Sequence, residues 1–134
     1  MNSIQDLIKI NIDIKRDFRG DLIPIEFQKN LNFNIKRSFI VYGKQNFIRG
    51  NHAHIECNQF LCCINGICEI KCDDGKDSNI NILDSPSTIL KIPNMIWSTQ
   101  KYKSNNTILL VLCDQDYSEK DYIRDYEQFL LFKK

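Results

Sequence analysis

The chain has two histidines, and both lie in the segment Arg49-Gly50-Asn51-His52-Ala53-His54. Alternate side chains of an extended strand share one face, so the two imidazoles are expected to point the same way. Histidine is the side chain whose ordinary pKa lets it gain or lose a proton near neutral pH. If the shared face lines the interior of a barrel, His52 and His54 are candidates for proton transfer. The competing interpretation, a surface or hydrogen-bonded core role, suits an isolated histidine better than a pair beside an arginine and a glycine.

A metal site is the next interpretation that this segment suggests. Four residues separate His54 from Gln59 and six more separate Gln59 from Gly66, which is the spacing of the first cupin motif. Glutamine, however, stands where that motif has its metal-binding carboxylate. The second cupin motif places a histidine a few residues after a proline, and residues 93–98 contain none. Because carboxylate or thiolate normally completes such sites, neither a metal nor another cofactor is expected.

Other kinds of chemistry have less support. Cys57 is close to the histidines in sequence, but no cation or helix N-terminus is placed to lower the pKa of its thiol, so a nucleophilic role is not expected. No glycine-rich phosphate loop is present, and a bound phosphate would need side chains such as Arg19, Arg37 or Arg49. Arg49 is favoured because it shares the histidine segment. Trp97 is either a core residue or a flat wall for a bound ring, and the sequence leaves both open.

Short runs of β-branched and aromatic residues recur along the chain and are separated by turn residues. They predict strands at residues 35–42, 60–64, 67–72, 80–83, 88–92 and 107–113. Asn65-Gly66 separates two of these runs and is a strong signal for a two-residue hairpin, because both positions tolerate positive φ. Asp73-Asp74-Gly75 predicts another turn. Residues 107–113 are almost continuously apolar, as expected for a strand buried on both faces.

The end of the chain departs from this pattern. Ser118-Glu119-Lys120-Asp121 approximates a capping box, and apolar residues then recur at helical spacing from Tyr122 to Leu130. Many short strands followed by one amphipathic helix predict an all-β fold, a β-barrel of the jelly-roll type with a short C-terminal helix.

Length and composition limit the class of protein. A chain of 134 residues suffices for one core, so a single domain over residues 1–134 is expected. The net charge of +1 gives no electrostatic footprint for nucleic acid or a membrane surface. No apolar run approaches the ~20 residues that span a bilayer, and the charged N-terminal stretch does not read as a signal peptide. Cys62, Cys63, Cys68 and Cys72 lie in strand-like runs without CxxC spacing, which indicates small buried thiols and a reduced, cytoplasmic protein.

Further motifs stand in order along the chain. They are Arg19-Gly20-Asp21-Leu22, Ile35-Lys36-Arg37, the histidine segment, Gln59, Asn65-Gly66, residues 93–97 and Asp121-Tyr122-Ile123-Arg124-Asp125-Tyr126. Together they resemble the dTDP-4-keto-6-deoxyglucose 3,4-ketoisomerases, and the pairing of the HAH element with the terminal DYIRDY is the most specific part. The chain departs from that family at Ser38-Phe39-Ile40, where members often have tyrosines, and at Ser98, where some have histidine. An auxiliary hydroxyl and a third imidazole are therefore left open.

The resemblance implies a metal-free cupin jelly roll, commonly a homodimer with exchanged N-terminal strands. The implied substrate is a dTDP-linked 4-keto-6-deoxy sugar, on the route to 3-amino-3,6-dideoxy sugars of surface glycans such as O-antigen, where an aminotransferase acts next. The resemblance also assigns roles to six residues: a catalytic pair, His52 and His54; two arginines facing the nucleotide diphosphate, Arg19 and Arg49; and two pocket residues, Gln59 and Trp97.

The chemistry of such a sugar fits a pair of imidazoles. The C4 carbonyl acidifies the C3 proton, a neutral imidazole removes it, and return of a proton to C4 moves the ketone by one carbon. His52 is assigned as the base and His54 as the group that protonates or orients it, although the sequence does not distinguish the two roles or the C4 stereochemistry. A cupin 5-epimerase, a non-enzymatic sugar-nucleotide sensor and a metal dioxygenase are the alternatives, the last lacking its ligands.

Overall fold

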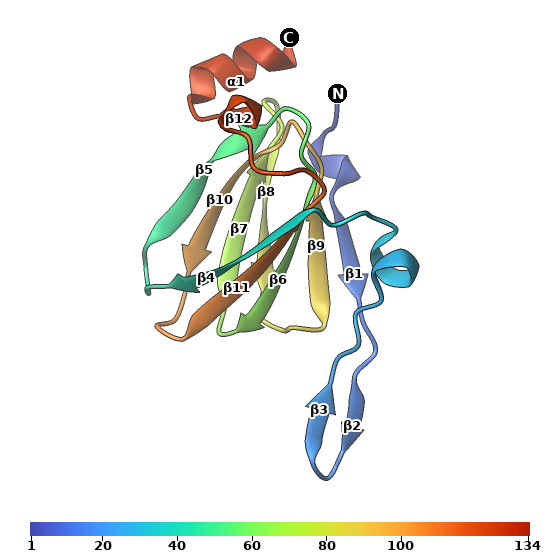
Figure 1. The fold of residues 1–134 in the computed structure, drawn as a ribbon. Helices are drawn as coiled ribbons and strands as arrows, with labels where there is room; N and C mark the ends of the chain where they lie inside the picture. Colours follow the sequence, from blue (N-terminus) through green and yellow to red (C-terminus); the bar gives the residue numbers. More distant parts are fainter.

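A computed structural model describes residues 1–134, in which two five-stranded antiparallel sheets pack face to face (Figure 1). The first sheet has the order β1 (Ile8–Asn11), β9 (Thr88–Ile92), β6 (Gln59–Asn65), β11 (Thr107–Cys113) and β4 (Arg37–Gly43). The second has the order β12 (Tyr122–Ile123), β5 (Ile48–His54), β10 (Trp97–Tyr102), β7 (Cys68–Asp73) and β8 (Ser78–Leu83). The prediction of an all-β jelly roll is confirmed.

The remaining elements lie at the two ends of this double sheet. A hairpin of β2 (Lys15–Asp17) and β3 (Gly20–Leu22) projects away from it, whereas the helix α1 (Tyr126–Lys133) packs at the opposite end (Figure 1). Three single turns, η1 (Ile4–Asp6), η2 (Phe27–Leu31) and η3 (Glu119–Asp121), complete the chain. None of these helical segments has the length and apolar composition needed to cross a bilayer.

Cysteines fill much of the space between the sheets. Cys57, Cys63, Cys68, Cys72 and Cys113 all belong to the central apolar cluster, and none of them is in a disulfide. Burial raises the pKa of the Cys68 and Cys72 thiols to about 12, which keeps them protonated. They pack as small apolar side chains, as the sequence indicated for the strand cysteines.

The turn at Asn65-Gly66 does not close a hairpin, and this part of the prediction is wrong. The two runs beside it do form β6 and β7, but β6 pairs with β9 and β11 while β7 pairs with β8 and β10. The turn therefore carries the chain from one sheet to the other. Gly66 has φ +78°, and a Cβ there would lie 2.5 Å from the Ser104 hydroxyl in the adjacent loop. The sequence correctly predicted a turn with positive φ at this position, but tertiary packing decides which strands pair.

The C-terminal helix begins later than the capping pattern predicted. The side chain of Ser118 caps nothing, and Tyr122 and Ile123 extend the second sheet by pairing with β5. The helix starts after Asp125, whose carboxylate accepts a hydrogen bond from the backbone N–H of Gln128. The two apolar residues at the start of the supposed helix are strand residues, and they hold Asp121 against the histidine segment.

Candidate active site

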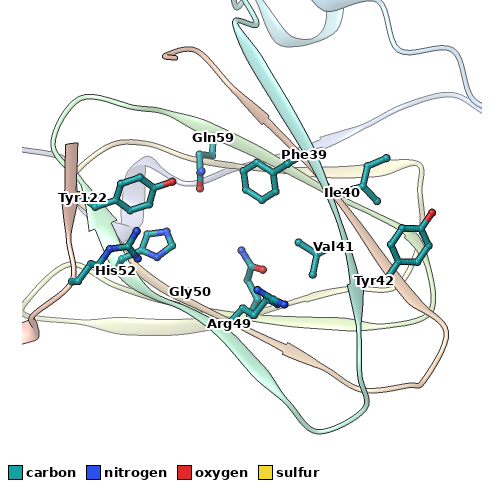
Figure 2. A pocket seen from close by; sticks show the side chains of 11 residues that line it. Phe39, Ile40, Val41, Tyr42, Arg49, Gly50, His52, Gln59 and Tyr122 are labelled. Carbon is teal, nitrogen blue, oxygen red and sulfur yellow. The ribbon is translucent and has the colours of Figure 1, made fainter. Parts of the chain in front are cut away.

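A cavity of about 540 Å³ opens between the two sheets (Figure 2). His52 and Tyr122 lie at one end of it, and Tyr42 lies at the other. Residues of β4, β5, β6, β10 and β12 line it, together with the arginine that follows β12: Phe39, Ile40, Val41, Tyr42, Arg49, Gly50, His52, Gln59, Gln100, Tyr122 and Arg124. The cavity thus combines an apolar wall from β4 with a wall of polar side chains.

A β-bulge in β5 allows Arg49 and His52 to line the same cavity. Residues three apart on a regular strand point to opposite faces. In the ladder with β10, Ser98 pairs with His52 and the next residue of β10 pairs with Gly50, so Asn51 is an extra residue. Gly50 has φ +93°, and a Cβ there would lie 2.8 Å from the carbonyl oxygen of Ser98. The bulge therefore needs a glycine, and it brings Arg49 to the cavity that His52 lines.

The histidine pair is brought together as the strand alternation predicted. The rings of His52 and His54 lie 5.0 Å apart between centroids and meet edge to face. His52 lines the cavity, whereas His54 is not among the lining residues and is more deeply buried, with 6% of its surface exposed. The Tyr122 ring packs against both, at 5.0 Å from His52 and 4.4 Å from His54.

The carboxylate of Asp121 contacts the Nδ1 side of the His54 ring. Its Oδ2 lies 2.9 Å from Nδ1 of His54, and its two oxygens also accept hydrogen bonds from the backbone N–H groups of Glu56 and Cys57. These donors fix the carboxylate, which in turn favours the tautomer of His54 that carries its proton on Nδ1. Sequence reasoning did not assign Asp121, although it is the first residue of the DYIRDY motif, and the strand pairing of that motif with β5 explains its position.

Both imidazoles are held neutral near pH 7. Burial lowers the pKa of His52 to about 4, and the nearby His54 adds to this effect. Burial also lowers the pKa of His54, against the opposing influence of its hydrogen bond to Asp121. A neutral imidazole in a shielded cavity can accept a proton from a bound molecule.

The depressed pKa of His52 predicts a pH-dependent stability. The folded protein binds this proton only near pH 4, whereas the unfolded chain binds it near 6.5. The stabilising contribution is therefore complete above about pH 6.5 and is lost as the pH falls towards 4, by up to about 3 kcal/mol. Urea unfolding of wild type and His52→Asn at a series of pH values measures it. The wild type should lose more stability than the variant over this range, and parallel curves would contradict the burial of a neutral His52.

Two arginines contact Tyr122, one at its ring and one at its hydroxyl. The guanidinium carbon of Arg124 lies 4.3 Å from the centroid of the Tyr122 ring, and Arg124 is itself held by Glu119. Nη2 of Arg37 donates to the hydroxyl of Tyr122 at 3.5 Å. β12 thus supplies a hydroxyl in this cavity, while β4 presents the ring of Phe39, which carries none. The sequence pattern assigned residues 122–123 to the helix, so it did not predict that Tyr122 would join β5 and line the cavity.

Two of the predicted binding residues line the cavity, and a third lies far from it in the hairpin. Arg49 and Gln59 line the cavity, and the amide of Gln59 donates to the sulfur of Cys113 at 3.5 Å. Arg19 lies at the tip of the projecting hairpin, exposed and paired with Asp17, outside the cavity of its own chain.

Trp97 does not line this cavity, which contradicts its predicted place. Its ring packs against Tyr126 and Phe129 of α1, at 5.3 and 5.7 Å between centroids. The reason is the alternation of β10, where Ser98 and Gln100 are buried and Trp97 faces the other way. Of the residues of β10, Gln100 lines the cavity.

Comparison with known proteins extends these observations. The family model FdtA, described as "WxcM-like, C-terminal", matches residues 2–134. The TDP-4-oxo-6-deoxy-alpha-D-glucose-3,4-oxoisomerase of Aneurinibacillus thermoaerophilus is 39% identical over 114 residues, which cover 84% of this chain and 82% of the relative. The resemblance drawn from the motifs is thereby confirmed.

Solved structures agree with the sequence relatives. A 3,4-ketoisomerase from Helicobacter canadensis superposes with a TM-score of 0.91 at 40% identity and covers 96% of this chain and 97% of its own. A sugar 3,4-ketoisomerase from Thermoanaerobacterium thermosaccharolyticum, in complex with TDP, superposes with a TM-score of 0.92 at 30% identity, with 98% and 96% covered. Because the family model extends over nearly the whole chain and these proteins match over most of their own lengths, the chain belongs to the WxcM-like, C-terminal family, together with sugar-nucleotide 3,4-ketoisomerases.

Proposed function

We propose that this protein moves the keto group of dTDP-4-keto-6-deoxyglucose from C4 to C3, and that His52 and His54 carry the protons. The observation that carries the proposal is the pair of neutral imidazoles, one lining a cavity beside Arg49 and the other held by Asp121. The relative from Aneurinibacillus is named for this reaction. A variant of the Thermoanaerobacterium ketoisomerase with one histidine replaced by asparagine is known in complex with TDP-4-keto-6-deoxyglucose, which supports the substrate.

The proposed reaction removes one proton from carbon and returns one to carbon, each step paired with a proton transfer at oxygen, without net oxidation. His52 removes the C3 proton, the electrons of the C–H bond form the C3–C4 double bond, and the C4 oxygen takes up a proton to give an enediol. C4 then receives a proton while the C3 hydroxyl loses its own, which leaves the ketone at C3. We assign His52 as the base because it lines the cavity, and His54 as the group that orients or reprotonates it. The hydroxyl of Tyr122 is a candidate donor to the oxygens of the enediol.

We propose that the reaction uses no metal. The positions where metal cupins supply ligands hold His52, His54, Gln59 and Ser98, and this set contains no anion to balance a divalent cation.

Incubation with dTDP-4-keto-6-deoxyglucose in deuterated water and excess EDTA tests both the function and the absence of a metal. We expect turnover at the rate seen without EDTA, with deuterium at C4 of a 3-keto product located by NMR. Label at C5 of an unmoved 4-ketone would indicate the 5-epimerase. Binding without turnover would indicate the sensor, and turnover lost to EDTA and restored by one divalent ion would contradict the metal-free mechanism.

We propose that residues 1–134 act as one cupin unit in the cytoplasm. The free, buried thiols support a reducing compartment. The C3 ketone of the product is the group that an aminotransferase replaces with an amine, which supports a place in the synthesis of 3-amino-3,6-dideoxy sugars.

We also propose a homodimer that exchanges its N-terminal strands, so that Arg19 reaches the cavity of the partner. Three apolar side chains of this region are exposed in the single chain: Ile8 by 48%, Phe18 by 98% and Leu22 by 61%. β1 forms the edge of the first sheet, and the hairpin stands clear of the molecule (Figure 1). Apolar surface and an open strand edge are features that a second copy would cover.

Substitution of either arginine should act on binding. Arg49→Ala and Arg19→Ala are expected to raise KM for the nucleotide sugar roughly 10–100-fold with little change in kcat, because charge-assisted hydrogen bonds to phosphate act largely on the ground state. Arg16→Ala in the same hairpin, where Arg16 pairs with Asp21, is the matched control. Loss of kcat at unchanged KM would contradict these roles.

Mixing the two variants tests the exchange itself. If Arg19 serves the partner's cavity, a dimer of one Arg19→Ala chain and one Arg49→Ala chain has one intact site and one site lacking both arginines. Co-refolded mixtures should then regain normal KM in a fraction of their sites. A mixture that behaves as the average of its parents, or a monomer by light scattering, would contradict the exchanged dimer.

A further inference from the structure

Three side chains that can bind a metal ion lie close together, and one of them is His54 of the catalytic pair. A ring nitrogen of His54, the sulfur of Cys57 and a carboxylate oxygen of Asp121 all lie within 4.8 Å of one another. His54 and Cys57 are buried, and Asp121 is nearly so, with 12% of its side chain exposed. Imidazole, thiolate and carboxylate are the three ligand types that Zn²⁺ takes in proteins.

We propose that His54, Cys57 and Asp121 form a binding site for Zn²⁺ and similar thiophilic divalent cations, and that its occupation switches the enzyme off. The binding part stands on the cluster alone, whereas the inhibition rests on the proposed function. The site differs from the metal position of other cupins, because it uses the Nδ1 side of one histidine and neither His52 nor Gln59.

A separate hollow at the surface reaches one member of this cluster, Asp121. It has a volume of about 250 Å³, and Asp121 lies in its wall together with Glu56, Gln115, Asp116 and Lys120. Three carboxylates against one ammonium make this hollow attractive to a cation. None of these residues lines the large cavity, so an ion that approaches Asp121 from this side does not pass the residues proposed to bind the substrate.

The geometry requires only a small adjustment for coordination. Zinc bonds of about 2.0–2.3 Å in a tetrahedron place ligand atoms about 3.5 Å apart. Nδ1 of His54 and Oδ2 of Asp121 are already 2.9 Å apart, and the carboxylate is anchored by the Glu56 N–H, which donates to its other oxygen at 2.6 Å. The thiol of Cys57 donates to the Asn58 carbonyl at 3.4 Å, and its side chain would have to rotate to bring the sulfur to the metal. Water entering through the hollow supplies the fourth ligand.

Coordination would move two protons. The thiol of Cys57 releases its proton to solvent as the sulfur becomes a thiolate ligand. Nδ1 of His54 gives its lone pair to the metal, so the proton of the neutral ring moves to Nε2, an atom that is buried without a hydrogen-bond partner. The bond to Asp121 is lost, and Nε2 changes from acceptor to donor beside His52. Turnover should stop because His54 then has the wrong tautomer.

Titration with Co²⁺, under reducing conditions after EDTA treatment, tests the binding independently of activity. Wild type is expected to take up one ion with a thiolate-to-cobalt charge-transfer absorption and tetrahedral d–d bands, which Zn²⁺ displaces. Cys57→Ser should lose the charge-transfer band and bind the ion more weakly, because a hydroxyl is a poorer ligand for these ions than a thiolate, while keeping normal turnover without metal. Cys62→Ser, which removes another buried thiol, should bind as wild type does.

The same proteins then report on inhibition. Saturating Zn²⁺ should stop turnover by wild type and Cys62→Ser, EDTA should restore it, and Cys57→Ser should resist. His52→Asn should still show the cobalt spectrum, which separates this site from one between the two imidazoles. Absence of a charge-transfer band in wild type, or equal inhibition of Cys57→Ser, would overturn the proposal. Cobalt binding by a protein that never isomerises the sugar would leave the site standing and overturn only the proposed function.

Discussion

His52→Asn should lower kcat by about 10²–10⁴-fold, the contribution of a positioned general base, while the affinity for dTDP stays nearly unchanged. His52 lines the cavity with an imidazole that burial keeps neutral, and no carboxylate lines the cavity to replace it as a base. The nucleotide is expected to be held by Arg49 and by the partner's hairpin. Steady-state kinetics and calorimetric titration with dTDP measure the two effects separately.

Exchange of the C3 proton with solvent separates the roles within the pair. His52→Asn should lose both exchange and turnover. His54→Asn should also turn over more slowly, and it should retain exchange if His54 serves only to return a proton to C4. If both variants turned over 4-keto-6-deoxy sugar nucleotides as fast as wild type, the proposed mechanism would be contradicted and the non-enzymatic sugar-nucleotide sensor would be favoured.

Asp121→Asn should lower kcat on the order of 10²-fold or more through the orientation of His54, as expected when a buried carboxylate that fixes a catalytic imidazole is neutralised. The amide can still accept from the Glu56 N–H through its oxygen, but its NH₂ group then faces Nδ1 of His54 and donates to it. This arrangement favours the opposite tautomer. The fold should survive because the side chain keeps its shape.

NMR of the imidazole nitrogens reads the tautomer directly, and the spectrum is simple because the chain has two histidines. In wild type the His54 proton should sit on Nδ1, and in Asp121→Asn it should move to Nε2. Asp125→Asn, in the same motif, is the matched control, since asparagine caps a helix as well as aspartate does. A slow Asp121→Asn enzyme with an unchanged tautomer would show that Asp121 acts on stability and not on His54.

The sequence was informative wherever local rules decide the structure. Strand alternation placed His52 and His54 together, and the apolar run at residues 107–113 is the inner strand β11. It failed where long-range pairing decides. Gly66 adopts the positive φ of a turn, yet which strands pair around it depends on the closing of two sheets. Asp121 could not be assigned, because its 2.9 Å contact with His54 spans 67 residues and exists only once residues 122–123 join β5.

The bulge at Asn51 makes β5 a strand with two phases. Before the bulge, the odd-numbered Arg49 faces the cavity. After the bulge, the even-numbered His52 faces it, because the extra residue reverses the alternation of side chains. Deletion of Asn51 would restore a single phase, and the strand could then present either its phosphate-binding cation or its proton-transfer groups, but not both. Anion recognition and acid–base chemistry on one strand are thus joined by a single inserted residue, and the length of this segment is constrained as strictly as its composition.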